Sequence, residues 1–169
     1  MNIYRICGYG SGRSALVAKL VKEYEFRGVR VAVIKYAHKP FDMDKEGSDT
    51  WNLRQSGCSQ TLIANNERWG LLCETPQCAK PDPIALVRHL GICDLVLAVG
   101  FDHTPLPGLE TLRADNHTQP LCSRDMLLQT VVSNDVVIAN IPFHFLHDEV
   151  EALADHILNQ SVPIPGREC

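Results

Sequence analysis

Apolar residues in the first part of the chain follow two different spacings. Residues 2–6 form a short, mostly apolar run that is typical of a strand. Residues 13–27 follow a helical period, and one face carries Leu16, Val17, Leu20, Val21 and Tyr24. Residues 29–35 are almost continuously apolar and rich in valine, as in a strand that is covered on both faces of a parallel sheet. Strand, helix and strand in this order predict a right-handed βαβ unit.

The middle of the chain predicts a polar loop, a short helix and a hairpin. Residues 36–48 are polar, and Asp49 is a candidate N-cap for a helix over residues 50–56. Two apolar runs then flank a turn that contains two asparagines, which tolerate turn geometry. The predicted hairpin strands are residues 60–64 and 69–73.

The remaining pattern extends the same architecture. Helices are predicted from Pro83 to about residue 90 and over residues 148–159. The predicted strands are residues 95–99, 109–113, 127–132 and 136–141. We therefore expect one α/β domain over residues 1–160, with a mostly parallel sheet flanked by helices and an added β-hairpin. A flexible tail is expected over residues 161–169.

Composition narrows the class of protein. A chain of 169 residues suits one domain with a sizeable core, and its formal net charge of −4 comes without a basic stripe, which argues against nucleic acid as a partner. No apolar run reaches the roughly 18 residues that span a bilayer, and the first residues lack the apolar stretch of a signal peptide. We expect a cytoplasmic protein that does not bind membranes, whose seven cysteines are reduced thiols.

A glycine-rich turn joins the first strand to the first helix. Residues 7–14 read Cys-Gly-Tyr-Gly-Ser-Gly-Arg-Ser, which resembles a Walker A sequence with Cys7 at its first glycine and Arg13 at its lysine. Glycines let backbone N–H groups converge on a phosphate at a helix N-terminus. The candidate phosphate-binding residues are Gly8, Tyr9, Gly10, Ser11, Gly12, Arg13, Ser14 and Ala15. The alternative is a strand-to-helix turn without a ligand.

Two further sets of residues could complete a nucleotide site. The Ser14 hydroxyl, Asp42 and Asp44 could hold Mg²⁺ beside the phosphates, although a solvated acidic loop also explains the two aspartates. Asn134 and Asp135 follow a predicted strand, and an aspartate can accept from guanine N1–H and N2–H groups that adenine lacks. A simple turn at the end of the strand is the alternative there.

A hydrolytic acid is not evident in the pattern. Such an acid is expected at the carboxyl end of an apolar strand, but residues 95–99 end in Val99. Asp94 precedes the strand, so Asp102 is the nearest substitute. No residue stands out as a hydrolytic base.

Several sequence runs resemble the molybdopterin-guanine dinucleotide biosynthesis protein B (MobB) family. The first is Val-Ile-Lys-Tyr-Ala-His at residues 33–38, followed by Asp-Met-Asp-Lys-Glu-Gly-Ser-Asp at residues 42–49. Leu-Arg-Gln-Ser-Gly at residues 53–57, Asn-Glu-Arg-Trp at residues 66–69, and the strand that leads to Gly100 and Phe101 extend the resemblance.

The resemblance implies a P-loop NTPase-like fold, a homodimer built partly through strands, and GTP binding with weak hydrolysis. It also implies an accessory role beside the molybdenum cofactor guanylyltransferase and other maturation proteins of that pathway. Arg13, Val99 and Asp102 depart from the lysine, the acid and the basic residue of the family at these positions. We therefore expect at most a weak GTPase. A nucleotide-free scaffold and a P-loop small-molecule kinase are the other interpretations.

Overall fold

The computed structural model divides the chain into two compact units, and each has its own secondary structure. The residues that it describes are 1–9, 12–75, 80–115 and 119–165. The main unit consists of Met1–Tyr36 and Pro81–Cys169, and the hairpin unit consists of Ala37–Lys80.

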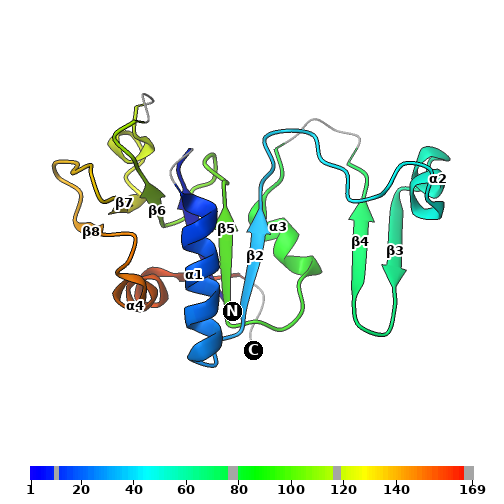
Figure 1. The fold of residues 1–169 in the computed structure, drawn as a ribbon, viewed down its shortest axis with the longest axis horizontal. Coiled ribbons are helices and arrows are strands. Elements are labelled where there is room, and N and C mark those ends of the chain that lie inside the picture. The colour runs from blue at the N-terminus through cyan, green and yellow to red at the C-terminus, as the bar shows by residue number, and fades with distance from the viewer. Residues whose placement is uncertain (10–11, 76–79, 116–118, 166–169) are drawn as a thin grey trace. The chain divides into compact units, whose positions relative to one another are not determined.

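A seven-stranded, mostly parallel sheet forms the centre of the main unit (Figure 1). In spatial order its strands are β2 (Val31–Lys35), β5 (Leu95–Val99), β1 (Asn2–Cys7), β6 (Gly108–Thr111), β7 (Leu128–Val132) and β8 (Phe143–Phe145). All these neighbours are parallel, and the short β9 (Val162–Pro163) adds to β1 in the antiparallel direction. The chain leaves β1 for β2 on one side and later builds β6 on the other, so the turn after β1 lies where ligands bind in open α/β sheets.

Helices cover both faces of this sheet. On one face, α1 (Arg13–Phe26) and α4 (Val150–Gln160) pack on apolar residues of β1, β5, β6 and β7. On the other face, α3 (Pro83–Leu86) and the 3₁₀ turn η1 (Val87–His89) pack on β2 and β5. A second 3₁₀ turn, η2 (Leu121–Ser123), precedes β7.

The helices of the described residues are too short or too polar to cross a bilayer.

The hairpin unit contains α2 (Asp49–Gln55), β3 (Gln60–Ala64) and β4 (Trp69–Cys73). The two strands pair in antiparallel register, with Leu62 opposite Leu71. Asn65 closes the turn, because its side-chain oxygen accepts from the backbone N–H groups of Glu67 and Arg68 at 2.9 and 2.8 Å. The predicted hairpin is confirmed.

Two local predictions differ from the structure. The N-cap of α2 is Ser48, whose hydroxyl accepts from the Trp51 N–H at 3.3 Å, and Asp49 is the first helical residue. Residues 136–141 are irregular, and the edge strand forms at β8 instead. The apolar pattern of this segment reflects packing and not strand pairing. A small core cluster around Val131 and Cys122 is packed against by Val136, Ile138 and Ile141.

Part of the predicted tail is also ordered. Residues 162–163 form β9, and Ile164, which follows them, is buried. The last four residues of the tail, 166–169, lie outside the described part of the chain.

Candidate nucleotide-binding site

The turn after β1 presents the open N-terminus of α1. Gly8 and Gly12 have φ values of 116° and 79°, a left-handed region that glycine enters without strain. Gly12 is the N-cap and has no side chain to satisfy the first N–H groups of the helix, which also carries no acidic residue in its first turn. Those N–H groups and the helix dipole favour an anion. Gly10 and Ser11 of the predicted phosphate set lie outside the described residues.

A cavity of about 570 Å³ opens beside this helix N-terminus, within the size range of small-molecule sites. Its lining residues are Gly12, Ala15, Leu16, Lys19, Arg113, Ala114, Asp115, Asn134, Asp135 and His147. The cavity thus brings the predicted phosphate turn and the predicted base-reading pair together. Both belong to the main unit, and both lie at the carboxyl ends of parallel strands.

Asn134 and Asp135 hold together the loops that surround the cavity. The Asn134 Oδ1 atom accepts from the backbone N–H of His147 at 2.9 Å and lies 3.3 Å from its Nδ1. The Asp135 Oδ2 atom accepts from the Ala114 N–H at 3.2 Å. A carboxylate has about four acceptor positions, so Asp135 keeps capacity for a ligand.

Three basic side chains of the cavity are absent from the candidates that the sequence suggested. Lys19 lies on α1, and its Nζ is 2.6 Å from the exposed Asp148 carboxylate. Arg113 follows β6, and His147 follows β8. A Cβ atom on Gly12 would lie 3.4 Å from Arg113 Nη2 and 3.7 Å from His147 Nε2, so both side chains reach the turn. No local signal in the sequence marks Arg113 and His147, and their position after β6 and β8 becomes informative only once the order of the strands is known.

Arg13 points elsewhere. Its guanidinium lies against the end of β5, where both Nη atoms are 3.4 Å from the position of a Cβ on Gly100. Its Nη1 atom is buried and has no hydrogen-bond partner among the described residues. Arg13 does not line the cavity, whereas Ser14 is exposed in the first turn of α1.

The carboxyl end of β5, where a hydrolytic acid is expected, carries an apolar residue. Val99 is 2% exposed and packs in the apolar cluster of α1 and α4. Asp102 lies three residues further on, and its buried carboxylate faces the side chains of Tyr9 and Cys7.

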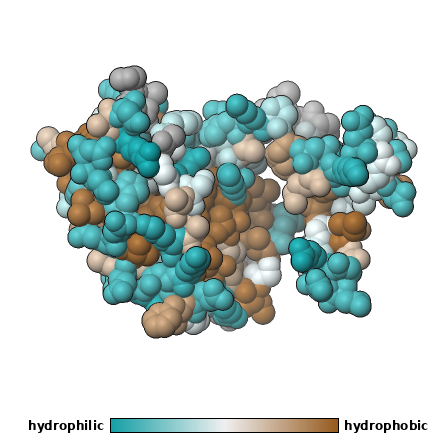
Figure 2. Space-filling model, viewed as in Figure 1, coloured by the Kyte–Doolittle hydropathy of each residue, from teal (hydrophilic) through white to brown (hydrophobic). Residues whose placement is uncertain are grey.

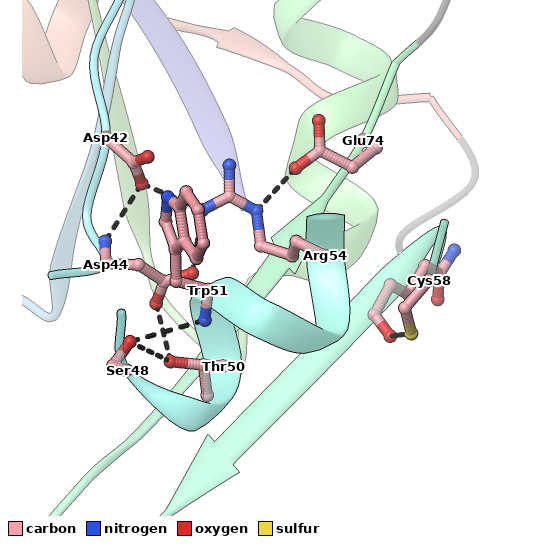
Figure 3. A network of polar contacts seen from close by, with 9 residues as sticks. Asp42, Asp44, Ser48, Thr50, Trp51, Arg54, Cys58 and Glu74 are labelled. Atoms are coloured by element: carbon pink, nitrogen blue, oxygen red, sulfur yellow. Dashed lines mark hydrogen bonds and ion pairs between the residues drawn. The ribbon is translucent and has the colours of Figure 1, made fainter. Parts of the chain in front are cut away.

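In the hairpin unit, Arg54 pairs with two carboxylates of the acidic loop and with Glu74 (Figure 3). Its Nη1 atom donates to Asp42 Oδ1 at 2.8 Å and to Asp44 Oδ2 at 2.7 Å, and its Nε donates to Glu74 Oε1 at 2.6 Å. The pKa of Asp42 is lowered, first by the hydrogen bond from the Asp44 N–H and then by Arg54. A cation at these carboxylates would compete with Arg54, so Mg²⁺ binding by Ser14, Asp42 and Asp44 stays a prediction.

Comparison with known proteins identifies the family. Residues 3–134 match the family described as molybdopterin guanine dinucleotide synthesis protein B (MobB). This chain belongs to the MobB family. It is 39% identical over 130 residues to the "Molybdopterin-guanine dinucleotide biosynthesis adapter protein" of Haemophilus influenzae. The aligned residues cover 76% of this chain and 72% of that protein. The Escherichia coli protein of the same name is 32% identical over 155 residues, or 88% of this chain and 86% of the relative.

Solved structures share the fold of this MobB chain. The crystal structure of a molybdopterin-guanine biosynthesis protein B aligns with a TM-score of 0.72 at 24% identity, over 93% of this chain and 98% of that chain. MobB of Bacillus subtilis aligns with a TM-score of 0.70 at 14% identity, over 96% and 99% of the two chains. The predicted α/β fold, a mostly parallel sheet flanked by helices with an added hairpin, is confirmed.

The family match runs through most of the site. Residues 3–134 of this MobB chain include the glycine turn, Lys19, Arg113 and the strand that ends in Val99. Asp135 and His147 lie beyond the match and join the cavity through the loops after β7 and β8.

Proposed function

We propose that this MobB chain binds GTP in the cavity beside α1 and acts as an accessory protein in molybdopterin guanine dinucleotide biosynthesis, with little or no hydrolysis of its own. The observation that carries the proposal is that one cavity joins the glycine turn to the Asn134–Asp135 pair. Membership of the MobB family supports a role in this pathway, since two relatives are named adapter proteins of that biosynthesis.

The chemistry of the cavity suits a guanine nucleotide. The polyphosphate would meet the N–H groups of the first turn of α1, with Lys19 and Arg113 supplying positive charge at the same cavity. The Asp135 carboxylate would accept from guanine N1–H and N2–H groups, a pattern that adenine does not offer.

Weak hydrolysis is expected from two features. Val99 fills the end of β5 with an apolar side chain. Arg13 replaces the lysine of the Walker A sequence, and its guanidinium lies against the end of β5 and outside the cavity. Mg²⁺ would neutralise phosphate charge when bound, and Ser14 with Asp42 and Asp44 are the predicted ligands. The two aspartates would have to exchange Arg54 for the ion.

The same proposal includes a cytoplasmic homodimer whose partner is the molybdenum cofactor guanylyltransferase. Support for self-association comes from the hairpin unit, where Leu62 and Trp69 are 61% and 62% exposed. Figure 2 shows apolar side chains at the surface of this unit. A two-stranded hairpin is marginally stable alone, so a partner that covers these side chains would stabilise it.

Titration with a fluorescent GTP analogue tests the nucleotide site, with ATP as competitor. Gly12→Val is expected to weaken GTP binding by at least about tenfold, because a side chain there is strained at positive φ and meets Arg113. Gly91→Val is the matched control, since a Cβ at Gly91 meets nothing within 4 Å. The rate at which the unaltered protein releases phosphate from GTP is expected to be barely above background.

A nucleotide-free scaffold is the second candidate, and the position of Arg13 outside the cavity favours it. No binding of GTP at millimolar concentration by the unaltered protein would reject the first proposal in favour of this one. Stronger binding of ATP than of GTP would reject the base-reading role of Asp135.

A further inference from the structure

His147 lines the cavity at the start of α1. It follows β8 and is partly buried, and its Nε2 atom lies 3.7 Å from the position that a Cβ on Gly12 would take. The first N–H groups of α1 and the helix dipole favour an anion at this place. The ring of His147 therefore presents one nitrogen to the region where a phosphate would bind.

Asn134 determines which ring nitrogen of His147 carries the hydrogen. The backbone N–H of His147 donates to Asn134 Oδ1 at 2.9 Å, and because an N–H group only donates, this atom of the amide is its oxygen. The ring Nδ1 lies 3.3 Å from the same oxygen. An amide oxygen only accepts, so Nδ1 carries the hydrogen and donates it. In the neutral ring, Nε2 then has no hydrogen and directs a lone pair toward the start of α1.

The neutral and the protonated ring act on a phosphate in opposite ways. The lone pair of a neutral Nε2 repels a phosphate oxygen, whereas the Nε2–H group of an imidazolium donates a charge-assisted hydrogen bond to it. Histidine is the side chain that ordinarily changes charge between pH 5 and 8. A phosphate that contacts Nε2 of His147 should therefore bind together with a proton.

Charged side chains surround the ring from every element of the cavity wall. They are Lys19 of α1, Arg113 and Asp115 after β6, Asp135 after β7, and Asp148 and Glu149, which follow His147 in the chain. Lys19 is paired with Asp148 at 2.6 Å, whereas Arg113 Nη2 lies 3.4 Å from the same Cβ position on Gly12 that His147 approaches. The charge of Arg113 opposes a second positive charge on His147, and a phosphate between the two side chains would offset that repulsion.

We propose that His147 contacts a phosphate of the bound nucleotide through Nε2 as an imidazolium, so that GTP binding takes up a proton. Asn134 is the positioning residue, since it holds the ring and fixes its tautomer. One proton moves from solvent to Nε2, and no covalent bond to the nucleotide forms. The inference rests on the proposed GTP binding and goes beyond it, because it makes the affinity for the nucleotide depend on pH.

The test measures affinity for a fluorescent GTP analogue at pH 6 and pH 8, in excess EDTA so that metal binding does not contribute. The gain in affinity from pH 8 to pH 6 should be at least about fivefold larger in the unaltered protein than in His147→Gln. Both proteins bind the same nucleotide, so protonation of its own phosphates cancels in the comparison. His89→Gln is the matched control and should keep the full gain, because His89 is exposed in η1 on the other face of the sheet.

Nuclear magnetic resonance of ¹⁵N-labelled histidine rings gives a second readout on the unaltered protein. At pH 8 without nucleotide, the two ring nitrogens of His147 should show the neutral Nδ1–H tautomer. At a fixed pH near 7, addition of GTP should shift both nitrogens toward the protonated form. A neutral ring with its hydrogen on Nε2, or a ring whose protonation does not change with GTP, would overturn the inference.

Other outcomes separate the inference from the function beneath it. An equal gain at low pH in His147→Gln and in the unaltered protein overturns the inference alone. Guanosine, used as a competitor of the analogue, should show no such gain, because it has no phosphate, and a gain as large as that of GTP would place the proton at the base instead. Absence of GTP binding by the unaltered protein at both pH values rejects the proposed function and the inference with it.

Discussion

Gly108 is a residue at which β1 and β6 approach closely. A Cβ at this position would lie 2.5 Å from the Arg5 carbonyl oxygen and 2.9 Å from Arg5 Cβ, so β1 and β6 would have to separate. Gly108→Ala is expected to lower the free energy of unfolding by about 1–3 kcal/mol, the usual cost of overpacking. Urea denaturation measures it, with Gly91→Ala as a control that meets no atom within 4 Å. Equal stability of the two variants would show that the strands separate freely.

Single residues of the site differ in how far sequence alone could predict them. Gly12, Asn134 and Asp135 carry local signals, a glycine turn before a helix and a polar pair after a strand, and the structure places them in one cavity. Arg113 and His147 carry no local signal, because each is a basic residue in a polar loop. Their role arises only when β6 and β8 bring those loops beside the turn.

At the scale of elements, His156 links α4 to the far strands of the sheet. Its Nε2 is 2.8 Å from Thr130 Oγ1 on β7, and its ring packs on Phe143 and Phe145 of β8 at centroid distances of 4.5 and 5.1 Å. Burial lowers the pKa of His156 below its ordinary value of 6.5. The charged imidazole is therefore disfavoured in the folded protein.

The sign of the pH dependence follows from that shift. Between pH 6.5 and the lowered folded pKa, the unfolded chain binds more protons, so stability falls as pH falls. His156→Gln should remove this contribution, and the loss of stability from pH 7.5 to 5.5 should be smaller than in the unaltered protein. Chemical denaturation at each pH measures it. If His156→Gln loses as much stability from pH 7.5 to 5.5 as the unaltered protein, other histidines cause the pH dependence.

The elements themselves were predictable where the information is local. The predicted bounds of β3 and β4 match the structure to the residue, since each run has strand character and the Asn65 side chain closes the turn. The position of the edge strand was not predictable, because residues 136–141 are more apolar than the three residues of β8. Their apolar side chains pack on a core cluster without joining the sheet, which a one-dimensional pattern does not distinguish.

At the scale of the whole molecule, the exposed hairpin requires an explanation that one chain does not provide. The register places Leu62 opposite Leu71 and Ala64 opposite Trp69 on one face of the two strands. Thr61 is the only buried residue of β3, and β4 has none. A pair of strands with so little burial gains stability when a second copy covers its apolar face.

Leu62→Lys tests the proposed homodimer through this face. Leu62 is 61% exposed, so a lysine is tolerated in a single chain, whereas pairing two copies would bury like charges without partners. Sedimentation velocity should then show a monomer at concentrations where the unaltered protein is a dimer. Ile92→Lys is the control, because Ile92 is 82% exposed in the main unit and should leave the dimer intact. A dimer that survives Leu62→Lys and dissociates with Ile92→Lys would move the interface to the main unit, and the exposed hairpin would then be free to meet a different protein.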